Sequence, residues 1–272
     1  MTVLTLFALT AAPALAQDLE LPVLSPRAGV SQQVGTVMVS VDYSSPAQRD
    51  REIFGVLVPY GEVWRTGANN ATTLTVDGEV TIGGVEVPEG AYTLMTIPGA
   101  ESWTIILNSD PAARPWRHDE SLDLPRFDVK PVEGPGRERL TFLFEDTTDR
   151  STTLQLQWAN VVVPLAIEVD TPARANRHID NFVANAARRM SQAAMYQVDE
   201  GDLDTALQLA DKAVSVGGGW YATFTLAKVQ HARNEHKAAY KSAKLAQELG
   251  ADDDNFFYKD QVEEALATWP KK

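Results

Sequence analysis

The sequence predicts an α+β protein, in which an N-terminal antiparallel β-sandwich is followed by a C-terminal array of α-helical hairpins. Three observations lead to this prediction. Apolar residues alternate with polar ones over much of residues 17–170, a helical period replaces this alternation over residues 171–272, and small residues recur in the helical part at a fixed interval. Hydrophobic residues make up 44% of the 272 residues and charged residues 22%, which is a globular composition.

The first 16 residues have the pattern of a removable secretory signal. An apolar run ends at Ala14-Leu15-Ala16, and small residues at Ala14 and Ala16 suit signal peptidase, so we expect cleavage after Ala16 and a periplasmic or secreted protein. No Lys or Arg precedes this run, which leaves open a start further upstream or a short buried N-terminal segment. No later segment is apolar enough to span a membrane, and the absence of Cys excludes disulfides and thiol catalysis.

Strands are expected from Val30 to about Asp170. Val37, Val39 and Val41 alternate with polar or exposed types, which is the period of a half-buried strand. Further strand-like runs are Ala71–Val76, Tyr92–Ile97, Trp103–Leu107, Leu140–Phe144, Thr153–Trp158 and Val161–Val169. Short strands at close spacing with no helix between them predict a sandwich or a barrel.

Helices are expected after Thr171-Pro172. Their predicted ranges are Arg174–Val198, Leu203–Val216, Trp220–Arg233, Glu235–Leu249 and Asn255–Trp269. Ala206, Ala210, Ala213 and Gly217 recur 33 residues later as Ala239, Ala243, Ala246 and Gly250. This period resembles tetratricopeptide repeats, although the large aromatic residue expected early in each unit is replaced by Met190 and Thr223. The helices are expected to pack on the β domain or to offer a platform for a partner.

The charge of the chain is unevenly divided. The net charge is −13 at a sequence pI of about 4.7, which argues against nucleic acid or an anionic membrane surface as partner. Residues 17–170 hold 11 Lys and Arg against 23 Asp and Glu, and ten of these eleven cations are Arg. Because Arg favours bidentate pairing with carboxylates, one interpretation is that many of these arginines pair on an acidic surface.

The segment from Ile53 to Thr72 differs from the rest of the β half. Gly61 and Gly67 permit turns that would place several planar and hydrogen-bonding side chains on one rim. The candidate ligand-binding residues are Trp64, Arg65, Thr66, Asn69 and Asn70. The alternative is an ordered loop that Trp64 anchors to the sandwich, while the amides and Arg65 satisfy backbone groups.

Several stretches of the β half resemble the bacterial domain-of-unknown-function family 2911 (DUF2911). They are Ser25-Pro26-Arg27, Tyr43-Ser44-Ser45-Pro46, Trp64-Arg65-Thr66-Gly67-Ala68-Asn69, Gly90-Ala91-Tyr92-Thr93-Leu94 and Trp103-Thr104-Ile105-Ile106-Leu107-Asn108. The resemblance covers roughly residues 25–169 and implies an exported protein with helical repeats behind the domain. It implies no activity.

The chain also departs from the pattern that this resemblance implies. Ser45 stands where the family pattern has Arg, Asn70 stands where it has Glu, and Asp50 stands where it has Gly. Either a structural ion pair is lost from both sides, or a functional carboxylate is lost at position 70.

No complete catalytic or metal-binding set can be assembled from the sequence. His118, the one histidine of the β half, would act as a general base only if Asp119 or Glu120 oriented it, and otherwise belongs to a solvated loop. The four histidines never occur at i, i+4, so no metal and no cofactor are expected. The run Asp252-Asp253-Asp254-Asn255 is interpreted as the acidic start of the last helix, and Gly217-Gly218-Gly219 as a helix break.

The sequence therefore favours an exported, non-enzymatic binding or interaction protein of the bacterial cell envelope. Its partner would be a small polar ligand or an envelope protein, with no nucleic acid and no membrane span. The alternative is an envelope hydrolase or isomerase that acts on a polar small molecule or glycan through the Trp64–Thr72 loop. In that case Glu62 and Asp42 are the carboxylates expected to transfer protons.

Overall fold

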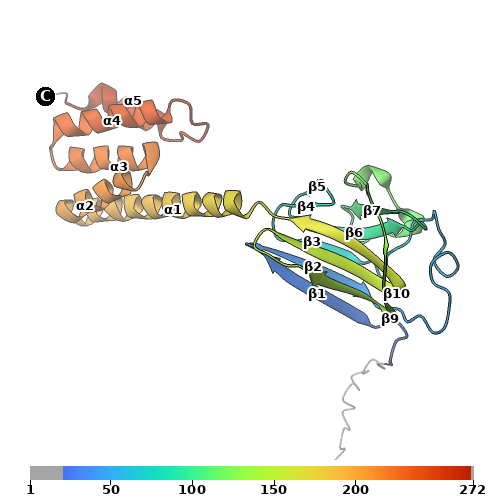
Figure 1. Cartoon of the computed structure of the whole chain (residues 1–272). Coiled ribbons are helices and arrows are strands. Elements are labelled where there is room, and N and C mark those ends of the chain that lie inside the picture. The colour runs from blue at the N-terminus through green and yellow to red at the C-terminus, as the bar shows by residue number, and fades with distance from the viewer. Residues whose placement is uncertain (1–20, 271–272) are drawn as a thin grey trace, which may run out of the picture. The chain divides into compact units, whose positions relative to one another are not determined.

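The computed structural model describes residues 21–270, so the expected signal segment at residues 1–16 lies outside the described residues (Figure 1). The chain divides into two compact units, Met1–Asp170 and Thr171–Lys272, which we call the β unit and the helical unit. The β unit contains two antiparallel sheets and the helical unit five α-helices, which confirms the α+β class. Within residues 21–270, no helix combines the length and the hydropathy that crossing a membrane requires.

The first sheet has six strands in the order β1-β2-β3-β6-β7-β8, all antiparallel. Their bounds are β1 Arg27–Val34, β2 Val37–Ser44, β3 Thr73–Val76, β6 Gly90–Ile97, β7 Trp103–Asn108 and β8 Phe127–Val129. The predicted alternation in β2 is confirmed, because Val37, Val39 and Val41 are buried while Met38 and Asp42 are exposed. One face of this sheet therefore points into the core.

The second sheet has four strands in the order β5-β4-β10-β9. Their bounds are β5 Val85–Val87, β4 Val80–Ile82, β10 Ser151–Glu168 and β9 Val132–Glu145. The prediction of two separate strands, Thr153–Trp158 and Val161–Val169, is wrong, because β10 is continuous over this range. The register shifts on both sides of Ala159, whose φ is +50°, so a bulge absorbs the irregularity and the strand continues. Pro164, which has no N–H, falls between the stretches that pair with β9 and with β4.

The two sheets share one hydrophobic core, as expected for a sandwich. Side chains from β2, β3, β6 and β7 meet side chains from β4, β9 and β10 in a single cluster. Its largest fully buried members include Trp103 and Trp158, together with leucines and isoleucines of both sheets. Burial of about 25 cal/mol per Å² of apolar surface is the main force that holds the two sheets together.

The segment between β2 and β3 adds aromatic side chains to the edge of this core. The ring of Phe54 packs edge-on against Trp103 at 4.9 Å and against Trp158 at 6.0 Å. The half-buried indole of Trp64 stacks on Trp158 with centroids 6.0 Å apart and planes 18° apart. Trp64 thus anchors the segment, as the ordered-loop interpretation expects.

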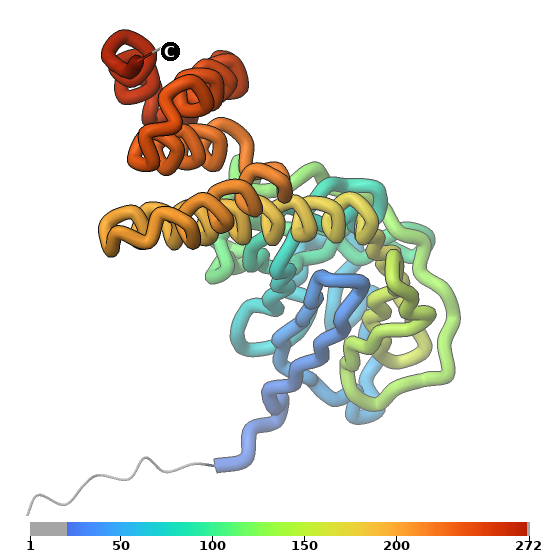
Figure 2. Tube along the Cα trace, turned by 90° about the vertical axis from the view of Figure 1, so that its left-hand side faces the viewer, coloured from blue at the N-terminus to red at the C-terminus, as the bar shows by residue number. Residues whose placement is uncertain are grey.

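The helical unit is built from α1 Thr171–Glu200, α2 Leu203–Ser215, α3 Gly219–Ala232, α4 His236–Gly250 and α5 Lys259–Thr268. The helices α2 and α3 lie against the C-terminal part of α1, as the orange part of the trace in Figure 2 shows. The repeating alanines at positions 206, 210, 239 and 243 are fully buried, so small side chains allow the helices to approach closely. The resemblance to tetratricopeptide repeats stays a prediction.

The last helix begins at Lys259, so the interpretation of Asp252-Asp253-Asp254-Asn255 as its acidic start is wrong. These residues form the turn after α4. The carboxylate of Asp253 accepts hydrogen bonds from Trp220 Nε1 at 2.8 Å and from the backbone N–H of Asn255 at 2.8 Å. The acidic residue therefore ties the turn to α3 instead of capping a helix.

The packing of Trp64 predicts a large stability effect at this one position. Trp64→Ala should lower the free energy of unfolding by about 3 kcal/mol, because the ring contacts three other aromatic rings of the core. Urea unfolding followed by circular dichroism measures this change.

Trp116→Ala is the matched control, since that ring is 66% exposed and only lies under the guanidinium of Arg65 at 5.4 Å. Its removal should cost less than about 1 kcal/mol. Equal losses in the two variants would contradict the anchoring role of Trp64.

Candidate functional site

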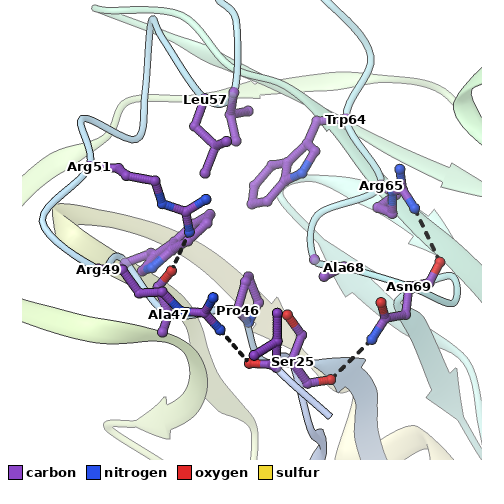
Figure 3. Close-up of a pocket in the computed structure, with 14 residues that line it drawn as sticks. Ser25, Pro46, Ala47, Arg49, Arg51, Leu57, Trp64, Arg65, Ala68 and Asn69 are labelled. Atoms are coloured by element: carbon purple, nitrogen blue, oxygen red, sulfur yellow. Dashed lines mark hydrogen bonds between the residues drawn. The ribbon is translucent and has the colours of Figure 1, made fainter.

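The β unit contains an open pocket of about 410 Å³ beside the segment between β2 and β3 (Figure 3). Trp64 and the buried Trp158 form its aromatic wall. Three arginines, Arg49, Arg51 and Arg65, stand around it. The remaining lining residues are Leu24, Ser25, Pro46, Ala47, Leu57, Val58, Gly67, Ala68 and Asn69.

Hydrogen bonds to strand β6 hold the segment between β2 and β3 in place on the side of the pocket. The backbone N–H of Trp64 donates to Thr96 O at 2.7 Å, and the N–H of Thr96 donates to Trp64 O at 3.0 Å. The hydroxyl Oγ1 of buried Thr66 lies 3.1 Å from Thr96 Oγ1, and Thr72 Oγ1 donates to Thr66 O at 2.9 Å. A Cβ at Gly67 would lie 2.8 Å from Thr72 Oγ1, so this close approach requires glycine.

Left-handed backbone conformations gather at the pocket. Positive φ angles occur at Arg49 (50°), Asp50 (57°), Thr66 (55°) and Asn69 (55°). This region is uncommon for any residue other than glycine, and Thr66 is β-branched, for which it is a rare exception. Each such residue costs on the order of 1–3 kcal/mol, so surrounding contacts must hold the loop in place.

The guanidinium groups of the three arginines donate to backbone carbonyls and not to carboxylates, although the backbone N–H of Arg49 donates to Glu138 Oε1 at 3.0 Å. Arg51 donates from Nη2 to Ala47 O at 2.7 Å and from Nε to Gln48 O at 2.9 Å. Arg49 Nη2 donates to Leu24 O at 3.3 Å, and Arg65 Nη1 donates to Asn69 O at 3.2 Å. Within residues 21–270 none of the three forms an ion pair, whereas Arg27 and Arg126 do. For the pocket, the interpretation that arginines pair with surface carboxylates is therefore wrong.

The structure brings together only some of the candidate residues of the Trp64–Thr72 loop. Trp64, Arg65 and Asn69 line the pocket, and Thr66 is buried beneath them. Asn70 lines a separate hollow of about 180 Å³, whose other residues include Arg27, Asp42 and Arg114.

Two parts of the pocket have no counterpart among the residues singled out in the sequence. Arg49 and Arg51 come from the turn that follows β2, and Trp158 comes from β10, far along the chain. The signal that could have pointed to the first pair is the spacing Arg49-Asp50-Arg51 in a segment that is otherwise poor in cations.

Both interpretations of the loop find support in Arg65 and Asn69. Asn69 Nδ2 donates to Ser25 O at 3.1 Å, so its amide satisfies a backbone carbonyl, as the ordered-loop interpretation expects. Arg65 makes one such bond, yet a guanidinium has five N–H donors. Its other donors form no hydrogen bond with the described residues, so the contacts of Arg65 are compatible with either interpretation.

His118 lies in a partly buried cluster that does not line this pocket, and the expectation that Asp119 or Glu120 would orient it is wrong. Its Nε2 lies 2.8 Å from Asp123 Oδ1, and both side chains are 6% exposed. Asp119 instead accepts from the backbone and side chain of Ser121, and Glu120 pairs with Arg126. The chain turns through two short 3-10 helices here, Pro115–Arg117 and Glu120–Leu122, and this turn brings the fifth residue onward beside the histidine.

Asp123 is the centre of this His118 cluster. Burial is the largest single effect on its pKa and would raise it, but hydrogen bonds from Asn108, His118 and Arg126 together lower the pKa below the usual value. Asn108 Nδ2 donates to Oδ1 at 2.8 Å, and Arg126 donates to Oδ2 from two nitrogens at 3.0 and 2.8 Å. The cluster closes the loop between β7 and β8. It does not line the pocket that Trp64, Trp158 and the three arginines surround, which we call the arginine pocket.

The fold and the pocket define the β unit as an antiparallel sandwich domain whose pocket is formed mainly by the segment between β2 and β3. The family described as "Protein of unknown function (DUF2911)" matches residues 25–167, which is more than half of the chain, and the chain belongs to this family. The resemblance seen in the sequence is thereby confirmed. Comparisons with curated proteins and with solved structures give no match. Among the described residues, no group of three or more His, Asp or Glu is placed to hold a metal ion.

The left-handed conformation of Thr66 predicts an unusual order of variants. Thr66→Gly should be more stable than Thr66→Ala by about 1 kcal/mol, because both lose the same hydroxyl and only glycine adopts this backbone without strain. Thermal unfolding of both variants measures the difference. An alanine variant at least as stable as the glycine variant would show that position 66 is not strained.

The lowered pKa of Asp123 predicts that the free energy of unfolding decreases at acidic pH. Because the folded pKa is depressed, the carboxylate stabilises the fold above its unfolded pKa of about 3.9, and this contribution disappears as the pH falls through the folded value. Wild type should be more stable than Asp123→Asn at neutral pH, and the gap should narrow below about pH 4. Urea midpoints at the two pH values test this, and a gap independent of pH would disprove it.

Proposed function

We propose that the β unit is a binding module for a small polar ligand in the bacterial cell envelope, and that the arginine pocket is its site. The observation that carries the proposal is an open hollow with an aromatic wall and three arginines that keep N–H donors free of carboxylates. A concave site with an apolar wall and a few convergent polar groups is typical of small-molecule binding.

Export is supported by the N-terminal sequence pattern. The apolar run that ends at Ala14-Leu15-Ala16 is typical of a secretory signal, which would place the mature protein in the periplasm or outside the cell. The net charge of −13 disfavours nucleic acid as a partner.

Binding is favoured over hydrolysis or isomerisation by the chemistry of the lining. No described residue of the pocket wall carries a carboxylate or an imidazole, so no side chain there is suited to proton transfer near neutral pH. Asp42 is one of the two carboxylates expected to transfer protons in an enzyme. It lines the smaller hollow, and its Oδ1 lies 3.6 Å from Nη2 of Arg27. Glu62, the other, is exposed and lines neither hollow.

A thermal-shift screen of the full chain tests the proposal. Sugars, peptidoglycan fragments, peptides, nucleotides and organic acids are added in turn, and at least one class should raise the melting temperature, because a ligand that binds only the folded state stabilises it. Arg65→Ala should reduce this rise, measured against the melting temperature of the variant itself.

Arg150→Ala is the matched control, since Arg150 is exposed and lies outside the pocket. It should keep the full rise. If no class of compound stabilises the wild type, or if Arg65→Ala keeps the rise, the pocket is not the binding site.

A further inference from the structure

We propose that the ligand of the arginine pocket is an organic anion, with a carboxylate or phosphate group at Arg49 and Arg51 and an apolar body against Trp64 and Leu57. The inference rests on the proposed function and adds to it the chemical class of the ligand. Figure 3 shows the arrangement: Arg49 and Arg51 stand on one side of the hollow, Arg65 and Asn69 on the other, with Trp64 between them.

The charge of the pocket is opposite to that of the unit around it. Residues 17–170 carry a net charge of −12, yet three of their eleven cations line this one hollow, and none of the three forms an ion pair within the described part of the chain. Like charges around one hollow repel each other, and a bound anion would remove that repulsion. The local charge therefore favours an anion and disfavours a cation.

The hydrogen-bonding groups of the pocket are mostly donors. Arg51 uses Nε and Nη2 on backbone carbonyls, which leaves Nη1, and Arg49 uses Nη2 alone, apart from its backbone. Guanidinium groups match carboxylate and phosphate oxygens in geometry and form charge-assisted hydrogen bonds with them.

Side-chain acceptors on the wall are few. Among the described lining residues, they are the amide oxygen of Asn69 and the hydroxyl of Ser25. A neutral sugar offers hydroxyl donors as well as acceptors and would leave many of its donors without a partner here. The balance of donors and acceptors thus favours an oxyanion over a neutral sugar.

Apolar side chains beside these donors indicate the other half of the ligand. Leu24 and Leu57 both line the pocket, although they are 70% and 43% exposed, and Trp64 lies next to them. Exposed apolar groups at the mouth of a charged pocket are typical of a site that buries the apolar part of its ligand. A volume of about 410 Å³ leaves room for a ring system in addition to the anionic group.

Matched pairs of compounds test this inference by isothermal titration calorimetry on the full chain. The probes are 2-naphthoate against 2-naphthamide, and 2-naphthyl phosphate against 2-naphthol. At least one anion should bind about tenfold or more tightly than its neutral partner, as expected for charge-assisted hydrogen bonds. Its affinity should fall as NaCl rises from about 20 mM to about 200 mM.

Arg51→Gln and Arg49→Gln should each weaken binding of that anion about tenfold while leaving the neutral compound unchanged. Arg150→Gln, outside the pocket, should bind as the wild type does. Two arginine variants are used because Arg51 also holds two backbone carbonyls, whereas the guanidinium of Arg49 holds one.

The outcomes separate this inference from the proposed function. Preference for the carboxylate pair or for the phosphate pair identifies the oxyanion and supports the inference. A neutral compound that binds as tightly as its anion, with no loss in either glutamine variant, overturns the anionic class but leaves a small-ligand site in place. If none of the four probes binds while only uncharged compounds raise the melting temperature in the thermal-shift screen, the anionic inference fails alone. If that screen also yields nothing, both proposals fail.

Discussion

Two backbone hydrogen bonds between Trp64 and Thr96, 2.7 and 3.0 Å long, tie the pocket loop to strand β6. They place the indole of Trp64 against Phe54, Trp103 and Trp158, so that the loop and the sandwich share one aromatic cluster. The same bridge holds Thr66 in a left-handed conformation that its β-branched side chain disfavours. Together with the hydrogen bond from Asn69 Nδ2 to Ser25 O, this bridge keeps Arg65 and Asn69 opposite Arg49 and Arg51, which come from the turn after β2. The pocket thus depends on a loop that packing, and not intrinsic preference, holds in shape.

The electrostatics of the β unit follow from the same arrangement. An acidic domain could neutralise its arginines with carboxylates, and it does so at Arg126, which pairs with Glu120 and Asp123. Around the pocket, backbone carbonyls take that place instead. A carbonyl orients a guanidinium but does not cancel its charge, so the positive potential remains available in the hollow. This is the physical basis for assigning an anionic ligand, and it separates the pocket from the His118 cluster, whose charges are already satisfied internally.

Much of the fold could be predicted from the sequence, because periodicity reports directly which side chains are buried. The alternation in Val37–Ser44 and the alanines spaced by 33 residues both correspond to buried faces. What could not be predicted depends on contacts between distant segments. Trp158 reaches the pocket from β10, a strand far along the chain from the loop, and the positive φ of Ala159 that lets β10 continue leaves no signal in the sequence. Likewise, His118 meets Asp123 and not its direct neighbours because two short 3-10 turns intervene. The sequence pointed to the Trp64–Thr72 loop, but it did not indicate that Arg49 and Arg51 would line the same pocket.

We expect the pocket to be formed before any ligand arrives, because the hydrogen bonds between Trp64 and Thr96 fix its loop on β6. Amide hydrogen exchange of the full chain without ligand, resolved by residue, tests this most directly. The amides of Trp64 and Thr96 should exchange as slowly as that of Leu94, which donates to Thr72 O within the same sheet. Exchange at Trp64 as fast as at exposed Glu62 would contradict the account, since the loop would then open freely and the arginines would have no fixed arrangement.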